Sequence, residues 1–332
     1  MQVNVQKEIP QRDAPLHVQS SFQRKGYLSD LIARNVFLVC AVLIVLIIVG
    51  VFVFLGINGF QLFTSDPAHA FTFFTSTRWQ LDPTQVDAYG PLSYGAGGFL
   101  LGSIVTTLVS IVIVTPLAFG MALFMTELSP RWLSNLLRPL LEIFTGMPSV
   151  VIGFLGLAVL VPWLTKVAGP LAPTPATAGF GWGAAILVLV VMVLPTVISI
   201  SIDVLRAVPD SVREASLALG STRWQTMKNA VLPAATTGLA TAVVLGMARA
   251  IGETLAVTMV LAGSITLPKN LFSLGAFFQP NITTTQIIVQ AFPNAATPEA
   301  RSACLMLGFV LLVISFLFIC VSRYLAGRSV YK

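Results

Sequence analysis

The sequence predicts an all-α integral membrane protein with six transmembrane helices and both termini in the cytoplasm. Of its 332 residues, 56% are hydrophobic and only 10% are charged, and the mean hydropathy is +0.87. A soluble domain carries about 25% charged residues. The composition therefore excludes a water-soluble enzyme. Glycine and proline occur inside the apolar stretches, as they do in membrane helices.

Six apolar runs are long enough to cross the roughly 30 Å of hydrocarbon in a bilayer. The predicted spans are Val36–Gly56, Gly102–Leu128, Pro148–Leu164, Trp182–Ile202, Gly238–Gly263 and Ala303–Leu325. Residues 1–26 are polar and lack helical periodicity, which predicts a flexible cytoplasmic tail. Residues 27–332 then form a single membrane domain. Pro116 and Pro195 predict kinks in the second and fourth spans.

The distribution of Lys and Arg predicts the orientation of these spans. If the N-terminus is inside, most of the positive charges fall in inner segments, whereas the outer loops hold only four. Those four are Arg78, Lys166, Lys269 and Arg301. Because positive charges concentrate on the cytoplasmic side, both termini are expected there. The net charge of +6 therefore reflects membrane topology and gives no reason to expect nucleic-acid binding.

The chain lacks the residues of an enzyme active site. Its two histidines, His17 and His69, lie far apart in a tail and a loop, and its three cysteines are isolated. No Gly-x-x-x-x-Gly-Lys phosphate loop occurs. We therefore expect no catalytic residues, no metal site and no cofactor in this chain, and no enzymatic activity of its own.

The longest inner segment, Asp203–Pro233, predicts two short helices. Pro209 can begin the first, and Gly220 ends it after a run of good helix formers. A second helix is expected from Arg223 to Val231, with Leu232 and Pro233 ending it before the fifth span. Two capped helices in this segment indicate a defined structure and not a passive linker.

The same segment resembles the EAA loop of ABC importer permeases, whose pattern is E-A-A-x3-G-x9-I-x-L-P. The matching residues are Glu214, Ala215, Gly220, Leu232 and Pro233, and the departures are Ser216 and Ala230. In that family the short helix before the glycine docks on the cytoplasmic ATPase. The resemblance implies that coupling to the ATPase falls to Arg213, Glu214, Ala215, Gly220 and Arg223. The alternative is an amphipathic helix that anchors the loop on anionic lipid.

Two charged residues, Arg249 and Glu253, lie near the middle of the predicted fifth span. Each costs about 2.5 to 3.5 kcal/mol to place there. They are four residues apart, so they share one helix face. A stripe of small residues runs along the same face, formed by Gly238, Ala242, Gly246 and Ala250, and the bulky Val244, Ile251 and Leu255 are expected opposite, toward lipid. The charges are therefore expected to face the bundle or a water-filled cavity, either as a substrate pathway or as a structural ion pair.

A guanidinium at this position suits a tetrahedral oxyanion, because it can donate to two oxygens at once. Glu253 would hold Arg249 when no anion is present and could accept a hydrogen bond from a protonated phosphate. The same carboxylate would repel a fully ionised sulfate. Ser149 and Thr254 are further hydroxyls expected to line this pathway.

The segment Arg249–Val257 resembles the R-A-[IL]-G-E-T signature of phosphate-specific permeases, and its continuation as Leu-Ala-Val is similar to the PstC type. Three further segments resemble PstC stretches, namely Phe73–Trp79, Ala122–Pro130 and Met147–Gly153. The resemblance implies a type I ABC importer permease fold in a bacterial cell membrane, among membrane lipids. It also implies a PstA-like second permease, a dimer of PstB-like ATPases that holds ATP and Mg, and an extracytoplasmic PstS-like phosphate-binding protein as partners.

Other functions remain open at this point. The same architecture could carry another tetrahedral oxyanion, such as molybdate, tungstate or sulfate. A secondary carrier could use Arg249 and Glu253 as an ion relay, but it has no use for an EAA spacing and no inverted repeat of broken helices is evident. A membrane enzyme would need more catalytic residues than the chain offers.

Overall fold

The structure is a computed structural model, and it describes residues 20–65, 68–81, 91–171, 177, 179–263 and 274–327. The chain divides into two compact units, residues 1–54 and 55–332, which are described separately. Residues 1–19 of the predicted tail lie outside the described part. Helix α1 (Ser20–Ser65) begins within the predicted tail, so residues 20–26 of that tail are helical.

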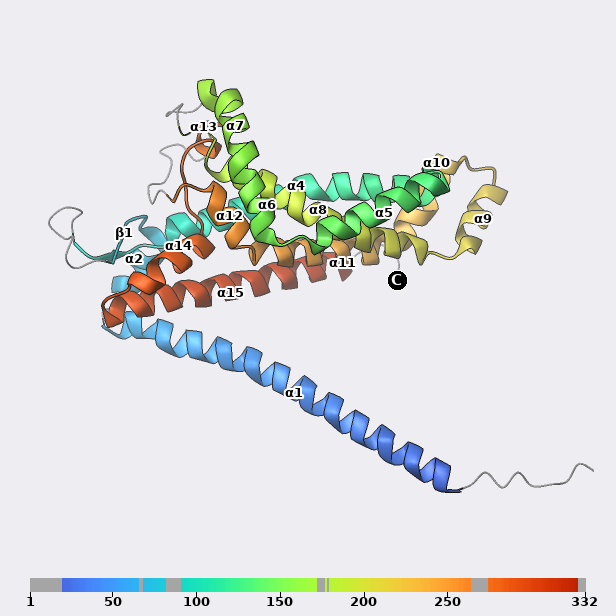
Figure 1. Ribbon diagram of the computed structural model, residues 1–332, viewed down its shortest axis with the longest axis horizontal. Helices are drawn as coiled ribbons and strands as arrows, with labels where there is room; N and C mark the ends of the chain where they lie inside the picture. The colour runs from blue at the N-terminus through green and yellow to red at the C-terminus, as the bar shows by residue number, and fades with distance from the viewer. Residues whose placement is uncertain are drawn as a thin grey trace, which may run out of the picture. The chain divides into compact units, whose positions relative to one another are not determined.

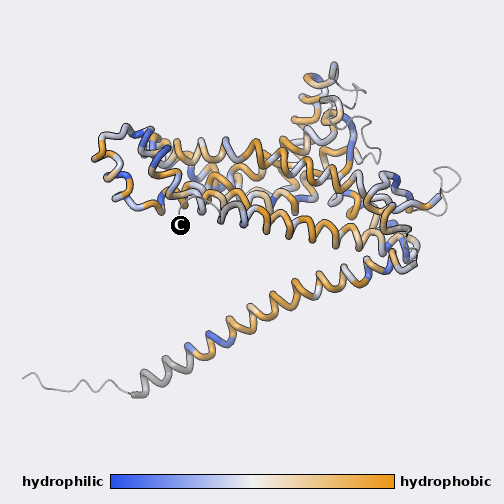
Figure 2. The backbone as a smooth tube through the Cα atoms, turned by 180° about the vertical axis from the view of Figure 1, so that it is seen from behind, coloured by the Kyte–Doolittle hydropathy of each residue, from blue (hydrophilic) through white to orange (hydrophobic). Residues whose placement is uncertain are grey.

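Helix α1 is apolar on every side. In the first unit, the side chains from Val36 to Phe54 are exposed, and nearly all of them are large and aliphatic or aromatic. Figure 2 shows this as a continuous apolar stretch along the helix. A helix with no polar face needs apolar surroundings on all sides, which a bilayer supplies. The first predicted span is therefore confirmed as a membrane helix by length and composition.

Six helices of the described residues are long and apolar enough to span a membrane, as the sequence predicts. They are Asp30–Thr64, Gly97–Leu128, Ser149–Ala168, Trp182–Arg206, Arg223–Ile251 and Pro298–Tyr324. Five of them overlap the predicted spans closely. The fifth differs, because its helix begins far earlier and ends at Ile251, whereas the predicted span continued to Gly263.

Three helices form the centre of the second unit: α4 (Gly97–Leu123), α8 (Trp182–Arg206) and α11 (Leu232–Ile251). They lie side by side in Figure 1, and α15 (Pro298–Gly327) packs against α11. The small-residue stripe of α11 lies in close contact with α8. A methyl group added at Gly246 would lie 2.5 Å from the side chain of Val197.

The expectation that Val244 and Ile251 face lipid is wrong. Their exposed fractions are 6% and 7%, and only Leu255 is exposed, at 49%. The reason is that α11 contacts α4, α8 and α15, so it is covered on more than one side. A helical wheel assumes one buried face, and this helix has several.

Among the described residues of the second unit, three π-helical segments lie within the spans or at their ends. They are η2 (Phe124–Leu128), η3 (Gly156–Leu160) and η6 (Met227–Val231). Segment η6 lies just before Pro233, which has no N–H to donate to the preceding turn. The wider π turn accommodates the proline. Consequently α10 (Arg223–Thr226), η6 and α11 form one continuous helix, and the predicted break at Leu232 and Pro233 is wrong.

Helix α5 (Arg131–Gly146) lies between the second and third predicted spans, where the sequence predicted no helix. It has no buried residue and runs beside α8. Its exposed apolar side chains include Trp132, Leu136, Leu140 and Ile143, which recur at helical spacing. Past Pro148 the chain continues as α6 (Ser149–Leu155), η3, α7 (Val161–Ala168) and η4 (Gly169–Leu171).

The end of the second unit away from α9 and α10 has its own aromatic core. The elements at this end are α2 (Ala68–Thr75), the antiparallel strands β1 (Trp79–Gln80) and β2 (Ser93–Tyr94), α14 (Thr284–Ala291) and η7 (Phe292–Asn294). Helix α13 (Leu274–Phe277) packs instead on α8, where Phe277 meets Trp182 edge to face at 6.2 Å. Trp79 and Phe99 pack edge to face at 5.4 Å. Burial, and next the Glu299 carboxylate, raise the pKa of Tyr94, so this phenol stays neutral.

Candidate functional site

The fifth span is broken where its charged residues lie. Helix α11 ends at Ile251, Gly252 is its C-cap, and a short helix α12 (Leu255–Val260) begins after Thr254. Arg249 therefore lies in the last turn of α11, whereas Glu253 lies in the break. The prediction that both charges share one face of a continuous helix is wrong.

Arg249 is stabilised separately from Glu253. Its Nη1 donates to Thr196 Oγ1 of α8 at 2.8 Å. Its place in the last turn of α11 also sets a positive charge at the negative end of the helix dipole. Within the described residues, no ion pair joins Arg249 to Glu253. The hypothesis that the two charges hold each other is therefore not supported in this conformation.

Glu253 is stabilised at the start of the next helix. Its Oε1 accepts a hydrogen bond from the backbone N–H of Ala256 at 3.2 Å, so the carboxylate caps α12. A negative charge at a helix N-terminus is favourable for the same electrostatic reason. The break therefore offsets part of the free-energy cost of placing each charge in the membrane. In a continuous helix, only a direct ion pair between the two side chains could offset that cost.

Glu253 also lines a small pocket. Its volume is about 10 Å³, which is room for about one water molecule. Five hydroxyl side chains share its lining with Glu253: Ser103, Thr106 and Thr107 of α4, and Thr283 and Thr285 near the start of α14. Thr107 is only 3% exposed, and its hydroxyl has no hydrogen-bond partner among the described residues. The pocket therefore has free hydrogen-bonding capacity beside a carboxylate.

Ser149 and Thr254 lie on two elements that approach each other closely. Ser149 begins α6, and α6 crosses α12 so tightly that a methyl group on Gly153 would lie 2.6 Å from Ala256 Cα. Thr254 precedes α12, and its hydroxyl donates to Gly252 O at 3.4 Å. Both side chains are partly buried. The structure thus places them near the break, without a direct contact to Arg249 or Glu253 among the described contacts.

The predicted coupling loop forms one separate short helix, α9, and α10, which is the first turn of the long helix that continues into α11. Helix α9 (Asp210–Ala218) follows Pro209, and α10 begins after Thr222, whose side chain accepts from Gln225 N–H in a capping box. Gly220 has a φ of +82°, which favours glycine. The hydroxyls of Ser216 and Thr226 lie 3.1 Å apart and join the two helices.

The coupling residues fall into two groups. Glu214, Ala215, Gly220 and Arg223 are exposed, so their surfaces are available to a partner. Three apolar side chains to which no sequence motif points are exposed beside them: Leu217, Leu219 and Trp224. Leu219 is 88% exposed. Arg213 differs, because its guanidinium points inward and pairs with Glu127 at the end of η2.

Across the part of the chain that the structure describes, no three His, Cys, Asp or Glu side chains gather closely enough to hold a metal ion. Arginine and glutamate inside membrane helices mark substrate or ion pathways.

Known proteins share this architecture and much of this sequence. The model of the family described as binding-protein-dependent transport system inner membrane component matches residues 115–330. The chain belongs to this family. This permease is 39% identical over 309 residues to the probable ABC transporter permease protein YqgH of Bacillus subtilis, covering 93% of this chain and 94% of that protein.

Several relatives of this permease are of the PstC type. It is 36% identical over 270 residues to the phosphate transport system permease protein PstC of Xylella fastidiosa, covering 77% of this chain and 79% of that protein. The PstC permease of Mesorhizobium japonicum is 30% identical over 320 residues, covering 92% of each chain. The resemblance to the PstC type is confirmed.

Solved structures show the same fold. An inward-facing structure of the MetNI methionine ABC transporter matches with a TM-score of 0.53 at 19% identity, covering 70% of this permease and 95% of that chain. A bacterial alginate ABC transporter, in complex with an alginate pentasaccharide-bound periplasmic protein, matches with a TM-score of 0.58 at 14% identity, covering 90% and 96%. The ABC importer permease fold that the resemblance implies is confirmed.

Proposed function

We propose that this permease is one of two membrane subunits of an importer that carries inorganic phosphate into the cell. A PstS-like binding protein outside the membrane would deliver the anion, and a PstA-like permease would complete the pathway. A dimer of PstB-like ATPases would bind the exposed loop of α9 and α10 and supply the energy of ATP. Both termini and this loop would then face the cytoplasm, as the distribution of Lys and Arg predicts.

The observation that carries the substrate assignment is the break in the fifth span. It presents the guanidinium of Arg249 and the carboxylate of Glu253 as separate groups, each stabilised by its own helix terminus and hydrogen bond. A guanidinium can donate to two phosphate oxygens, and a carboxylate can accept from the protonated oxygen that phosphate retains near neutral pH. The PstC relatives support the same substrate.

Ser149, Thr254 and the hydroxyl pocket would complete the pathway. Hydroxyl groups can donate to an anion and accept from its proton, so they suit a partly protonated tetrahedral ion. Thr107 and Ser103 lie on α4 and face the same pocket as Glu253. On this proposal they take over the hydrogen bonds of the phosphate as it leaves water.

The proposal is tested by uptake in vesicles that contain the assembled complex. Labelled phosphate should enter only when the binding protein is outside and ATP is inside. A large excess of unlabelled phosphate should compete, whereas molybdate, tungstate and sulfate should not. If one of these three anions competes better than phosphate, the permease serves that anion instead.

A further inference from the structure

We propose that Arg213 and Glu127 form a rigid joint that ties the α9–α10 loop to the ends of the second and fourth spans. Movement of α9 would then displace α4 and α8 together. This inference rests on the proposed function in one respect, because it says how a push on the loop reaches the pathway. Arg213 is then a positioning residue, and the earlier assignment of it to the ATPase contact is replaced.

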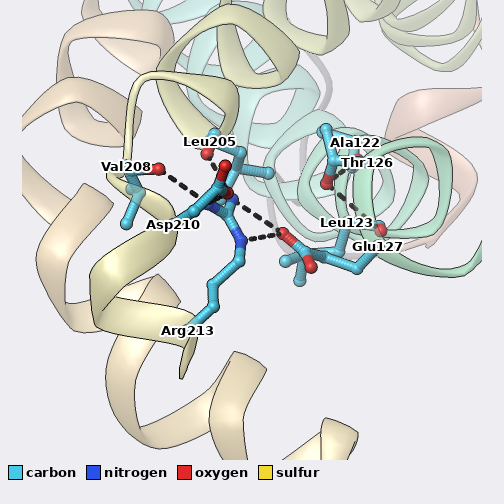
Figure 3. Close-up of polar contacts among 8 residues, drawn as sticks. All are labelled: Ala122, Leu123, Thr126, Glu127, Leu205, Val208, Asp210 and Arg213. Atoms are coloured by element: carbon cyan, nitrogen blue, oxygen red, sulfur yellow. Dashed lines mark hydrogen bonds and ion pairs between the residues drawn. The ribbon is translucent and has the colours of Figure 1, made fainter. Parts of the chain in front are cut away.

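The first half of the joint is an ion pair between α9 and the end of the second span. Arg213 donates from Nε and from Nη2 to the same carboxylate oxygen, Glu127 Oε1, at 3.2 and 3.0 Å. Figure 3 shows the guanidinium turned toward this carboxylate. Glu127 lies in η2, the π-helical end of that span. The pair therefore connects two segments that are far apart in the sequence.

The second half of the joint reaches the end of the fourth span. Arg213 Nη2 donates to Leu205 O at 2.9 Å, and Nη1 donates to Val208 O at 2.6 Å and to Asp210 Oδ1 at 3.2 Å. An arginine side chain has five N–H donors in a fixed planar arrangement. All five are used here, so this guanidinium has no donor left for the ATPase or for an anion.

These contacts immobilise the linker between α8 and α9. Helix α8 ends at Arg206 and α9 begins at Asp210, which leaves a short non-helical connection. Arg213 binds the carbonyl of Leu205 before that connection and the carbonyl of Val208 within it. Without these bonds the connection would act as a hinge, and a force on α9 would bend the linker before it moved the spans.

Burial separates this pair from the other ion pairs at the same end of the bundle. The side chains of Arg213 and Glu127 are 19% and 17% exposed. Arg138 approaches Glu142 at 3.8 Å and Asp203 at 3.6 Å, and all three of those side chains are about half exposed or more. Exposed pairs contribute little, whereas a shielded pair with additional hydrogen bonds holds its geometry. Arg138 and Glu142 therefore offer matched controls.

The first experiment compares Glu127→Gln and Arg213→Lys with the control variants Glu142→Gln and Arg138→Lys. Each is assembled with the ATPase, the second permease and the binding protein in vesicles, and phosphate uptake and ATP hydrolysis are measured together. We expect the joint variants to assemble and hydrolyse ATP, with phosphate carried per ATP lowered at least about tenfold, the loss expected from one charge-assisted hydrogen bond. The controls should keep the native ratio. A native ratio in both joint variants overturns the proposal.

A second measurement covers the case in which the joint variants fail to assemble. In a chain without Cys40, Cys304 and Cys320, spin labels at Ala218→Cys of α9 and Leu128→Cys of η2 report the distance across the joint. In the complex this distance should be the same with and without ATP. A distance that changes between the two states overturns the rigid joint. Because no substrate is needed, this result is independent of uptake, and a native complex that fails to carry phosphate would count against the proposed function alone.

Discussion

Arg249 donates its Nη1 proton to Thr196 Oγ1 across 2.8 Å, which joins the end of α11 to the middle of α8. The bond leaves the other four N–H donors of the guanidinium without a described protein partner. A guanidinium that is positioned but not saturated is available to a substrate anion. Arg213 differs, because all of its donors are used, which is why we propose Arg249 as a pathway residue and Arg213 as a positioning residue.

Arg249→Lys tests the requirement for a planar guanidinium. A lysine keeps the charge but cannot donate to two phosphate oxygens in parallel, so we expect phosphate uptake to fall about a hundredfold with assembly of the complex unchanged. Thr196→Val removes only the positioning bond and should lower uptake about tenfold. Thr241→Val is the control, because that hydroxyl donates to Thr237 O of its own helix. Native uptake by Arg249→Lys would contradict the assignment.

Glu253→Gln tests selection for a protonated anion. The amide keeps the shape of the side chain and can still accept at the start of α12, but it no longer repels a fully ionised oxyanion. We expect sulfate to inhibit phosphate uptake at a concentration about tenfold lower than it does in the native complex, since one unfavourable charge contact is removed. Competition curves measure this directly. Unchanged curves would place Glu253 outside the pathway.

Gly220→Ala tests the turn between α9 and α10. A φ of +82° costs an alanine roughly 1 to 2 kcal/mol, so less complex should form with the ATPase and the thermal midpoint should fall. Gly146→Ala is the matched control, because a methyl group added there meets no atom within 4 Å and Gly146 has no positive φ. Equal losses for the two variants would mean that the turn has no special role.

Leu219→Ser tests the exposed apolar side chains as the ATPase contact. Burying one leucine contributes about 1.5 to 3 kcal/mol, so the affinity for the ATPase should fall at least about tenfold. The control is Val289→Ser on α14, at the other end of the bundle and also exposed. Co-purification of the ATPase with each variant gives the comparison. If both variants retain it equally, the contact lies elsewhere.

The sequence predicted the number of spans, for which length and hydropathy suffice. It also predicted Gly220 as the residue that ends α9, because glycine favours helix ends. Arg249, Glu253 and Thr254 were singled out, but the helix break between Ile251 and Leu255 was not predicted. The break at Gly252–Thr254 was missed because a helical wheel treats every apolar run as one continuous helix. The residues between Arg249 and Leu255 include glycine and threonine, which favour helix ends.

Two further features needed the structure. Helix α5 was not predicted because Pro139 lies inside it and its apolar repeat is short. Pro130, just before the helix, is a helix-start signal. The hydroxyl pocket combines α4 with residues near Thr283, which are remote in sequence and ordinary in composition. Pairing of Arg213 with Glu127 was likewise beyond any local pattern, because the two residues are 86 positions apart.

On the proposed function, phosphate meets Arg249 and Glu253 at the break of the fifth span. This contact is tested most directly by a density map of the complete complex, stalled with the phosphate-loaded binding protein and a non-hydrolysable ATP analogue. We expect a tetrahedral density about 3 Å from the guanidinium of Arg249 and from the carboxylate of Glu253. Phosphate held elsewhere in the membrane, with lipid chains against both side chains, would contradict it.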